Sequence, residues 1–540
     1  MCNSIVNGRR RLLVGGAAMA GLTVAGLPAI LRAQQAPAVQ TASNVRPNAA
    51  WGLQIGDVRS DRAIVWSRSD KPARMFVHWS RHEDFRGAVE LRGPYALPES
   101  DLTSRIDLTE LPGDEEIFVK VVYEDLDSAK ARSEPVFGRF KTAPDARGRG
   151  DRRRDVRFLW GGDTAGQGWG IDLAFGGMKI YEAMRRTQPD FFIHSGDTIY
   201  ADGPLVERPV TPDGSLWINA FLNEVPEKLK VAETLQEFHR NYLYNLYDAN
   251  VRRFAAEVPQ IWQWDDHEVT NNWSDSKDLS GDARYTEKRV QTLVARATKA
   301  FLDYAPMRWN AQEESQRIYR HIPYGTDLDV FVIDMRSYRG PNTANLQPDQ
   351  GPETRFVGHE QIQWLKRKLD ASRATWKVIA ADMPIGLRVP DGDNRWEAIA
   401  NGNDGPALGR ELEIAELLRF IRREQITNVV WLTADVHYCA AHYYDPAKAQ
   451  FKDLAPFWEF VSGPLNAGTF GPNALDATFG PQVVFSKAPP AGQVNLPPSS
   501  GLQFFGQVDI EARSKDMVVA LKDIDGKEVF SQRLHATPGK

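Results

Sequence analysis

The chain has 540 residues, of which 42% are hydrophobic and 25% are charged, so it can form a large core and global disorder is excluded. The formal net charge of −5 gives no general attraction to nucleic acid or to anionic membranes, and we expect no nucleic-acid partner. The length suggests two domains, or one domain with an appendage.

The first 33 residues have the pattern of an export signal. An arginine run at residues 9–11 precedes Leu12–Leu31, an apolar stretch rich in Gly and Ala, and Ala33 ends a cleavage pattern. Paired arginines before a weakly hydrophobic run predict twin-arginine export, with the export machinery as a partner. An ordinary secretory signal or a retained membrane anchor is the alternative. No later stretch approaches the ~20 apolar residues of a membrane span, so we expect a periplasmic or secreted protein.

The segment after the signal predicts a small domain of its own. Residues 34–47 are rich in Ala, Pro, Ser and Asn, which is typical of a linker. Residues 48–142 contain short alternating runs such as Arg62–Arg68 and Glu116–Tyr123, separated by turn residues. This pattern predicts an antiparallel β-sandwich. The charged segment 143–155 is expected to be a second linker.

Residues 156–540 alternate between apolar runs and helical stretches, which predicts α/β architecture. Five apolar runs that contain acids at their ends are expected to be buried strands: Phe158–Asp163, Phe191–Tyr200, Ile261–Glu268, Val378–Asp382 and Val429–His437. The expected helices are Gly177–Arg186, Glu227–Ala249, Lys288–Tyr304, His359–Ser372 and Leu408–Gln425. Gly463–Ser500 is predicted to be a long irregular loop, followed by C-terminal strands.

Acids at the ends of several strands point to a shared site. Ligands of open α/β sheets bind outside the carboxyl ends of the strands. Several acids gathered at one edge repel one another, and a metal cluster is the simplest source of the compensating charge.

Three motifs carry this chemistry. In SGDTIY, Gly196 permits a tight turn, Asp197 lies at the sheet edge, and Tyr200 is within reach of the same point. In WDDHE, adjacent side chains cannot all face one ion. We therefore expect Asp266 to bind metal and His267 to face the substrate, while Asp265 and Glu268 support them. A structural acidic turn with a capping Asp is the alternative.

The third motif, TADVH, predicts that Asp435 and His437 share one face of a strand end and each bind one of two metals. The alternative for His437 is a satisfied core histidine. Cys439 follows closely, and it is either a buried apolar side chain or a further ligand.

Together and in this order, SGDTIY, WDDHE and TADVHY resemble the alkaline phosphatase D (PhoD-like) family of calcineurin-like metallophosphoesterases, which is related to the purple acid phosphatases. The signal and the N-terminal β-domain are similar as well, so the resemblance covers nearly the whole chain. It implies an α/β fold with a metallophosphoesterase-type β-sandwich core flanked by helices, preceded by a small antiparallel β-sandwich.

The resemblance also implies roles for single residues. Asp197 corresponds to a metal-bridging aspartate, Tyr200 and His437 to ligands of ferric iron, and Asp266 and Asp435 to ligands of a calcium-rich second site. His267 corresponds to the histidine beside the leaving group.

Two further acids take positions at which related proteins have metal ligands. Asp163 stands where the family has a cysteine and purple acid phosphatases have an aspartate, so it is expected to bind metal. Asp382 stands where the wider superfamily often has a histidine ligand, and it either binds metal or caps a turn. Such an oxygen-rich donor set suits calcium, magnesium, manganese or ferric iron better than zinc. We expect two or more ions, Fe³⁺ plus Ca²⁺.

Two arginines and two asparagines are candidates for substrate contact. Arg336 ends an apolar run and Arg339 follows, and Arg suits bidentate phosphate binding; we expect Arg336 to act in catalysis and Arg339 in substrate binding. The alternative is an ion pair with Asp334 or another structural acid. Asn271, with Asn272 beside it, is expected to hydrogen-bond the substrate, unless both are turn residues.

The expected function is that of an exported metal-dependent phosphoesterase, which hydrolyses phosphomonoesters and phosphodiesters through a metal-activated hydroxide. A phospholipase-type phosphodiesterase is a close variant. A secreted binding protein with structural metals is an alternative from a different class. The loops Asp202–Glu224 and Gly463–Ser500 are expected to decide the choice of substrate.

Overall fold

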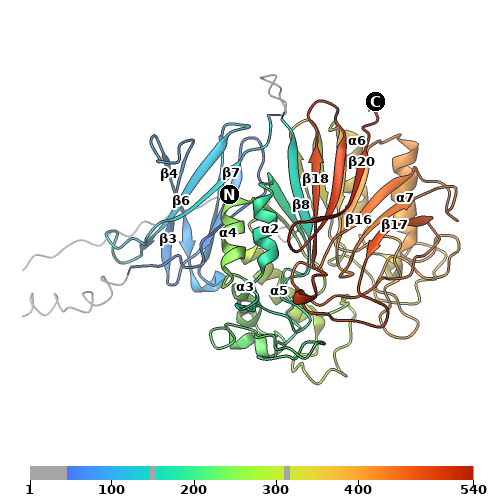
Figure 1. The fold of residues 1–540 in the computed structure, drawn as a ribbon, viewed down its shortest axis with the longest axis horizontal. Helices are drawn as coiled ribbons and strands as arrows, with labels where there is room; N and C mark the ends of the chain where they lie inside the picture. The colour runs from blue at the N-terminus through green and yellow to red at the C-terminus, as the bar shows by residue number, and fades with distance from the viewer. Residues whose placement is uncertain (1–45, 146–153, 309–316, 539–540) are drawn as a thin grey trace, which may run out of the picture. The chain divides into compact units, whose positions relative to one another are not determined.

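The apolar runs that end in acids form the middle strands of two large sheets. The computed structural model describes residues 46–145, 154–308 and 317–538 (Figure 1). The predicted signal and most of the predicted linker after it lie in residues 1–45, outside the described residues.

Among the described residues, the first sheet has nine strands in the order β20–β19–β18–β8–β9–β10–β1–β2–β5. The strands β8, β9 and β10 run parallel, and β18 joins β8 in antiparallel orientation. The bounds are β1 Leu53–Gly56, β2 Ala63–Arg68, β5 Thr103–Leu108, β8 Val156–Gly161, β9 Phe191–Ser195, β10 Gln260–Gln263, β18 Phe504–Ile510, β19 Met517–Asp523 and β20 Glu528–Leu534.

The second sheet has seven strands in this part of the chain, in the order β11–β12–β13–β14–β16–β15–β17. The four strands β12, β13, β14 and β16 run parallel, so their carboxyl ends lie at one edge. The bounds are β11 Arg320–Tyr324, β12 Leu328–Val332, β13 Trp376–Ala380, β14 Val429–Thr433, β15 Cys439–Tyr444, β16 Phe457–Val461 and β17 Pro481–Lys487.

Helices cover the outer faces of both sheets. Their bounds are α2 Lys179–Arg186, α3 Leu235–Asn245, α4 Ala249–Glu257, α5 Val290–Tyr304, α6 His359–Ala371 and α7 Glu411–Arg423. In Figure 1, α2 and α4 lie to the left of β8 and β18, and α7 lies to the right of β16. No helix in the described ranges is long and apolar enough to span a membrane.

The two sheets pack face to face, because their strands are apolar on both sides. In β8, Phe158 faces the second sheet, whereas its neighbour Leu159 packs against α2 and α4. In β13, Val378 faces the first sheet, whereas Ile379 packs against α6 and α7. This alternation is that of sheets buried on both faces. The predicted β-sandwich core with flanking helices is confirmed.

The N-terminal region forms a third sheet with the order β4–β3–β6–β7, all of it antiparallel. Its bounds are β3 Ala73–Ser80, β4 Val89–Ala96, β6 Glu116–Asp125 and β7 Val136–Lys141. One face packs on β1 and β2, which completes a small sandwich. Because β1 also pairs with β10, one layer of this sandwich continues the nine-stranded sheet. The predicted domain boundaries remain predictions.

Two predicted segments differ from the structure. The single helix expected at Glu227–Ala249 is wrong, because the chain breaks between α3 and α4, where the Asp248 side chain caps α4 by accepting from the N–H groups of Asn250 and Val251. The segment Gly463–Ser500 is not wholly irregular, since it contains β17, which pairs with β15 at the sheet edge.

A buried ion pair ties β1 to the second sheet, and we expect its loss to show a pH-dependent cost in stability. Asp57 is fully buried and pairs with Arg320 of β11 at 2.8 Å, and it also accepts from the backbone N–H of Arg308. Burial alone would raise the Asp57 pKa, but Arg320 and Arg308 outweigh it and lower the pKa. At pH 7, Asp57→Asn should reduce the free energy of unfolding by about 3–5 kcal/mol, since it leaves a buried charge unpaired.

The pH dependence distinguishes the ion pair from simple packing. A carboxyl with a lowered folded-state pKa contributes stability that is present above its unfolded pKa, about 3.9, and is lost as the pH falls through the folded value. Chemical denaturation from pH 7 down to pH 3 should therefore show the difference between wild type and Asp57→Asn narrowing below about pH 4. A difference that stays constant with pH would contradict the ionic origin.

Candidate metal centre

Acids follow the carboxyl ends of β8, β9, β10, β13 and β14, and the fold brings these ends to one edge. They are Asp163, Asp197, Asp265 with Asp266, Asp382 and Asp435. The first five are no more than 2% exposed. The expected meeting of acids from both sheets at one edge is therefore present.

Three groups of side chains in the described residues have ligand atoms within 4.8 Å of one another. The first contains Asp163, Asp197 and His437, the second Asp197, Asp266 and His267, and the third Asp265, Asp266 and Asp435. Asp197 and Asp266 each belong to two groups, so the groups form a continuous row. A row of this kind can hold more than one cation.

Three of these acids, and His437, have strained backbone. The φ angles are 71° at Asp163, 51° at Asp197, 67° at Asp435 and 60° at His437, in the left-handed region that most residues avoid. Such strain clusters at functional sites. The predicted strand geometry for Asp435 and His437 is wrong, because β14 ends at Thr433 and both residues lie in the loop that follows it. The two side chains belong to different groups, as expected for ligands of two different cations.

A glycine allows the close approach of two of these turns. Gly196 has φ 95°, and a Cβ atom there would lie 2.4 Å from the Cβ of Asp265. Any other residue at this position would push the turn that carries Asp197 away from the turn after β10.

The acids have oxygen atoms that the protein itself does not satisfy. Both carboxylate oxygens of Asp163 and of Asp382, together with Oδ2 of Asp265 and Oδ1 of Asp266, are buried and have no hydrogen-bond partner in the part of the chain that the structure describes. Buried oxygens of this kind are costly unless a cation or a donor meets them. The donor set is mainly carboxylate oxygen, so these residues fit hard cations.

The electrostatics agree with this fit. Burial raises the pKa values of Asp163, Asp197 and Asp435 well above the usual range, and repulsion from neighbouring acids raises them further. For Asp382, burial and the charge of Asp265 act in the same direction. A cation among these side chains would favour their ionised forms.

Tyr200 lies against both histidines of the centre. Its Oη is 2.8 Å from Nε2 of His437, and its ring stacks on the ring of His267 at 4.3 Å between centroids. The other ring nitrogen of His437 is hydrogen-bonded to the carbonyl of Gly468, and burial lowers the His437 pKa to about 4, which favours the neutral form that binds metals. Nε2 of His437 also lies 3.6 Å from Oδ1 of Asp163, so His437 is within reach of both Tyr200 and Asp163.

Asp202 is a site residue that the sequence motifs missed. Its Oδ1 accepts from Nδ1 of His267 at 2.6 Å, and its Oδ2 accepts from the backbone N–H of Asn271 at 2.7 Å. Burial lowers the His267 pKa, but the charges of Asp202 and Asp266 outweigh it and raise the pKa to about 9. The sequence shows Asp202 only as an acid two residues after Tyr200. No local pattern links it to His267, which is 65 positions away.

The remaining acids of WDDHE differ in their contacts. Glu268 accepts from the backbone N–H groups of Asp197, Thr198 and Asp265, so it holds two turns together, as a supporting residue would. Asp265 is ion-paired with Arg336, yet it also belongs to the third group of potential ligands.

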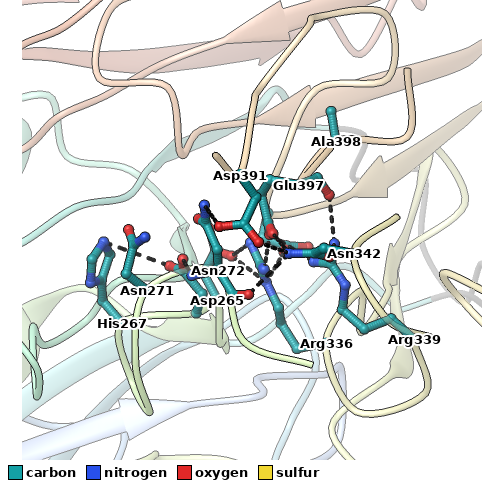
Figure 2. Close-up of polar contacts among 12 residues, drawn as sticks. Asp265, His267, Asn271, Asn272, Arg336, Arg339, Asn342, Asp391, Glu397 and Ala398 are labelled. Carbon is teal, nitrogen blue, oxygen red and sulfur yellow. Dashed lines mark hydrogen bonds and ion pairs between the residues drawn. The ribbon is translucent and has the colours of Figure 1, made fainter. Parts of the chain in front are cut away.

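Arg336 and Arg339 are enclosed by acids, and Asp382 lies beside Arg336 outside the three ligand groups. The side chains of Arg336 and Arg339 are 0% exposed; Arg336 pairs with Asp265 and Glu397, and Arg339 pairs with Glu397 (Figure 2). This burial favours the ion-paired alternative over phosphate contact, although the partner acid is not Asp334. Asp382 belongs to none of the three groups, and its Oδ2 is 3.4 Å from Nε of Arg336.

The two asparagines after WDDHE point in different directions. The backbone N–H of Asn271 donates to Asp202, the same carboxylate that binds His267. Asn271 is exposed, so it can meet a ligand. Asn272 instead donates its backbone N–H to Asp266 and its side-chain amide to Asp391.

Profiles of known families match most of the sequence. The PhoD-like phosphatase family matches residues 158–521, and the PhoD-like phosphatase N-terminal domain matches residues 34–144. Alkaline phosphatase D of Bacillus subtilis (strain 168) is 26% identical over 500 residues, which cover 86% of this chain and 77% of the Bacillus protein.

Two solved structures are similar over nearly the whole chain. The structure of PhoD matches with a TM-score of 0.65 and 19% identity, and covers 91% of this chain and 92% of its own. Purple acid phosphatase PPD1 from yellow lupin (Lupinus luteus) seeds matches with a TM-score of 0.53 and 12% identity, and covers 91% and 74%. At these identities, the two structures support the fold.

The family match and the site lead to the same conclusion. The profile at residues 158–521 includes all five strand ends that carry the buried acids. Family membership favours an enzyme over the metal-containing binding protein that the sequence left open. The chain belongs to the PhoD-like phosphatase family and is a metal-dependent phosphatase.

Proposed function

We propose that this phosphatase is an exported enzyme that hydrolyses phosphomonoesters and phosphodiesters with Fe³⁺ and Ca²⁺ as its cofactors. The observation that supports this most is the row of buried acids, several of whose oxygens have no hydrogen bond within the described residues, with Tyr200 and His437 at one end of the row. Asp163, Asp197, Tyr200 and His437 would hold the ferric ion, since phenolate and imidazole suit it.

The second cation would be held by oxygen atoms alone. Asp197, Asp266 and Asp435 would hold Ca²⁺, which prefers carboxylates. Asp382 is a candidate ligand only at the margin of this site, because it belongs to none of the three ligand groups. When bound, such a pair of cations polarises the phosphoryl oxygens and lowers the pKa of water.

The residues of the chain orient the ester and move the proton. His267 has its Nδ1 bound to Asp202, so Nε2 is the atom that carries a proton to the leaving alcohol oxygen. Asp202 also fixes the backbone of Asn271, whose side-chain amide hydrogen-bonds a substrate oxygen. Arg336 does not contact the ester but holds Asp265 and Glu397 in place, and Arg339 holds Glu397.

A chelation experiment tests this function directly. The purified mature protein is assayed on a chromogenic phosphate diester and on the matching monoester, before chelation, after it, and after metal is returned. We expect chelation to abolish both activities and metal to restore them. Elemental analysis and the visible tyrosinate–iron absorption band identify the cations. Hydrolysis that survives complete removal of metal would overturn the proposal.

Export is supported by the arginine run at residues 9–11 and the apolar stretch Leu12–Leu31. Fractionation of cells that express the full chain measures it. We expect the shortened, active protein outside the cytoplasm and only when the twin-arginine translocase is present. Full-length protein confined to the cytoplasm would contradict export.

An exposed apolar ribbon favours a phospholipid diester as a second candidate substrate. Val210 pairs with Leu216 in a two-stranded ribbon that begins a few residues after Asp202. One face, with Trp217 and Asn219, is buried. The other face presents four exposed apolar side chains, Val206, Val210, Leu216 and Ile218, which are 44–66% exposed. Apolar surface of this kind marks a binding area.

A double substitution on this ribbon tests the phospholipid candidate. Val210→Asp with Leu216→Asp places two charges on the exposed face and leaves the buried face unchanged. We expect activity on phosphatidylcholine vesicles to fall about tenfold or more, since two apolar side chains contribute about 1.5–3 kcal/mol each on burial. Activity on the soluble diester should stay unchanged in the same preparation. Equal activity of wild type and variant on vesicles would contradict the phospholipid candidate.

A further inference from the structure

A chain of buried contacts leads away from Asp265 behind the metal centre (Figure 2). Nε of Arg336 donates to Oδ1 of Asp265 at 2.7 Å, and Nη1 of the same arginine pairs with Oε1 of Glu397. The other oxygen of Glu397 accepts from the side-chain amide of Asn342 at 2.9 Å. One carboxylate of the centre is thus tied, through Arg336 and Glu397, to Asn342.

The series of contacts continues from Asn342 to Asp266, the residue that follows Asp265 in the sequence. The Asn342 amide also lies 3.1 Å from the carbonyl oxygen of Asn272, and the backbone N–H of Asn272 donates to Oδ2 of Asp266. Asp391 accepts from both asparagine side chains and strengthens this link. Because Asp265 and Asp266 are adjacent, the contacts close into a ring. We call this the hydrogen-bonded ring; its members are Asp265, Arg336, Glu397, Asn342, Asn272 and Asp266.

The ring engages one oxygen of each acid, and the other oxygen of each acid has no hydrogen bond within the described residues; Oδ1 of Asp266 lies 3.8 Å from Nε2 of His267. Oδ1 of Asp265 and Oδ2 of Asp266 are inside the ring. Oδ2 of Asp265 and Oδ1 of Asp266 are buried and have no hydrogen-bond partner in the described residues. Each carboxylate therefore has a fixed orientation and one oxygen left for a cation.

Glu397 is the member that organises the arginines. It pairs with Arg336 and Arg339, and its backbone carbonyl accepts from Arg410. Burial raises its pKa, but Arg336, Arg339 and Arg410 outweigh this and lower the pKa to about 2. An ionised Glu397 thus compensates guanidinium charge in a place that is closed to solvent and to substrate.

We propose that Glu397 and Asn342 are positioning residues of the metal centre, which act through Arg336 and Asn272 to aim the free oxygens of Asp265 and Asp266 at the bound cations. Adjacent carboxylates repel each other and would rotate apart without such restraints. The inference rests on the proposed function, because it requires cations at these acids. Partners that orient metal ligands typically change metal affinity or activity about 10–100-fold when they are lost.

The test measures metal binding by Glu397→Gln, a change that keeps the shape of the side chain and removes its charge. Ca²⁺ and Mn²⁺, each alone, are titrated calorimetrically into chelator-stripped wild-type and variant protein. We expect a dissociation constant about 10–100-fold higher in the variant. At saturating metal, kcat on the soluble diester should be lower while KM stays within about twofold, because Glu397 does not touch substrate.

Glu413→Gln is the matched control. Glu413 is also a buried glutamate, but within the described residues its side chain accepts only from the backbone N–H groups of Phe356, Val357 and Gly358. The Glu413→Gln substitution should lower the melting temperature and leave the metal affinity unchanged. If Glu397→Gln does not fold, Asn342→Ala serves instead, with a smaller loss of metal affinity expected because it removes no charge.

The outcomes separate this inference from the proposed function. The positioning role would be overturned if Glu397→Gln kept the metal affinity and the kcat of wild type. It would also be overturned if Glu413→Gln lost as much metal affinity as Glu397→Gln. Neither result would contradict the metal centre itself. If stripped wild-type protein binds neither cation and its activity does not depend on metal, the proposed function fails and the inference falls with it.

Discussion

Asp197→Asn is expected to remove cations from the whole centre and to abolish hydrolysis. Asp197 is the acid shared by the group with Asp163 and His437 and the group with Asp266 and His267. An asparagine has one oxygen and no charge, so it can serve only one ion, and weakly. The loss of activity should exceed the about 10–100-fold that loss of an outer partner of a ligand costs. Elemental analysis of the purified protein measures the metal per chain.

Folding of this variant should be preserved, which makes the result interpretable. The backbone N–H of His267 donates to Oδ1 of Asp197, and an asparagine oxygen can accept the same bond. Asp248→Asn is a matched control, since Asp248 is also buried but caps α4 instead. Its metal content and activity should equal those of wild type. Full metal content in Asp197→Asn would show that this residue does not bridge the two groups.

His267→Ala is expected to keep the metal and to lose most of the turnover. The imidazole is held by Asp202 through Nδ1, so the substitution removes the proton donor for the leaving oxygen. General acid catalysis contributes about 10²–10⁴-fold, and kcat on an alkyl phosphate ester should fall by that factor. Asp202→Asn should give a smaller fall, because the ring remains and only its orientation is weakened. Steady-state kinetics and elemental analysis on the same preparations measure both effects.

The leaving group supplies an internal control for this prediction. Nitrophenolate departs with little need of a proton, so His267→Ala should affect a nitrophenyl ester much less than an alkyl ester. If both esters lose activity equally, the defect comes from disturbed packing against Tyr200, whose ring stacks on His267. Turnover of the alkyl ester at the wild-type level would rule out the proton-donor role.

Local patterns predicted the secondary structure where no distant contact competes with them. The expected helix His359–Ser372 differs from α6, His359–Ala371, by one residue at its end. The expected Glu227–Ala249 failed because Asp248 can either continue a helix or cap a new one. Its side chain also accepts from the backbone N–H of Met178, 70 positions away, a contact that no local pattern contains.

Contacts between distant residues also explain why Arg336 does not lie where it was expected and why Asp202 was missed. Arg336 was expected at phosphate because an arginine at a strand end suits an anion. It is instead enclosed by Asp265 and by Glu397, which is 61 positions away, and only the folded chain brings them together. Asp202 was missed for the same reason, since its partnership with His267 spans 65 positions.

The amino-acid order alone indicates which residue types stand at the ends of the buried strands, because the apolar runs and the acids after them are local and the sheet edge brings them together. The motifs around Asp197, Asp266 and Asp435 therefore indicated the fold class and an oxygen-rich centre. Which oxygen of Asp265 and of Asp266 accepts a hydrogen bond, and that Arg336 is buried against Asp265 and Glu397, follow from the packing of the folded chain. These outcomes depend on hydrogen bonds and burial between residues far apart in the chain, and such contacts exist only once the two sheets have packed together.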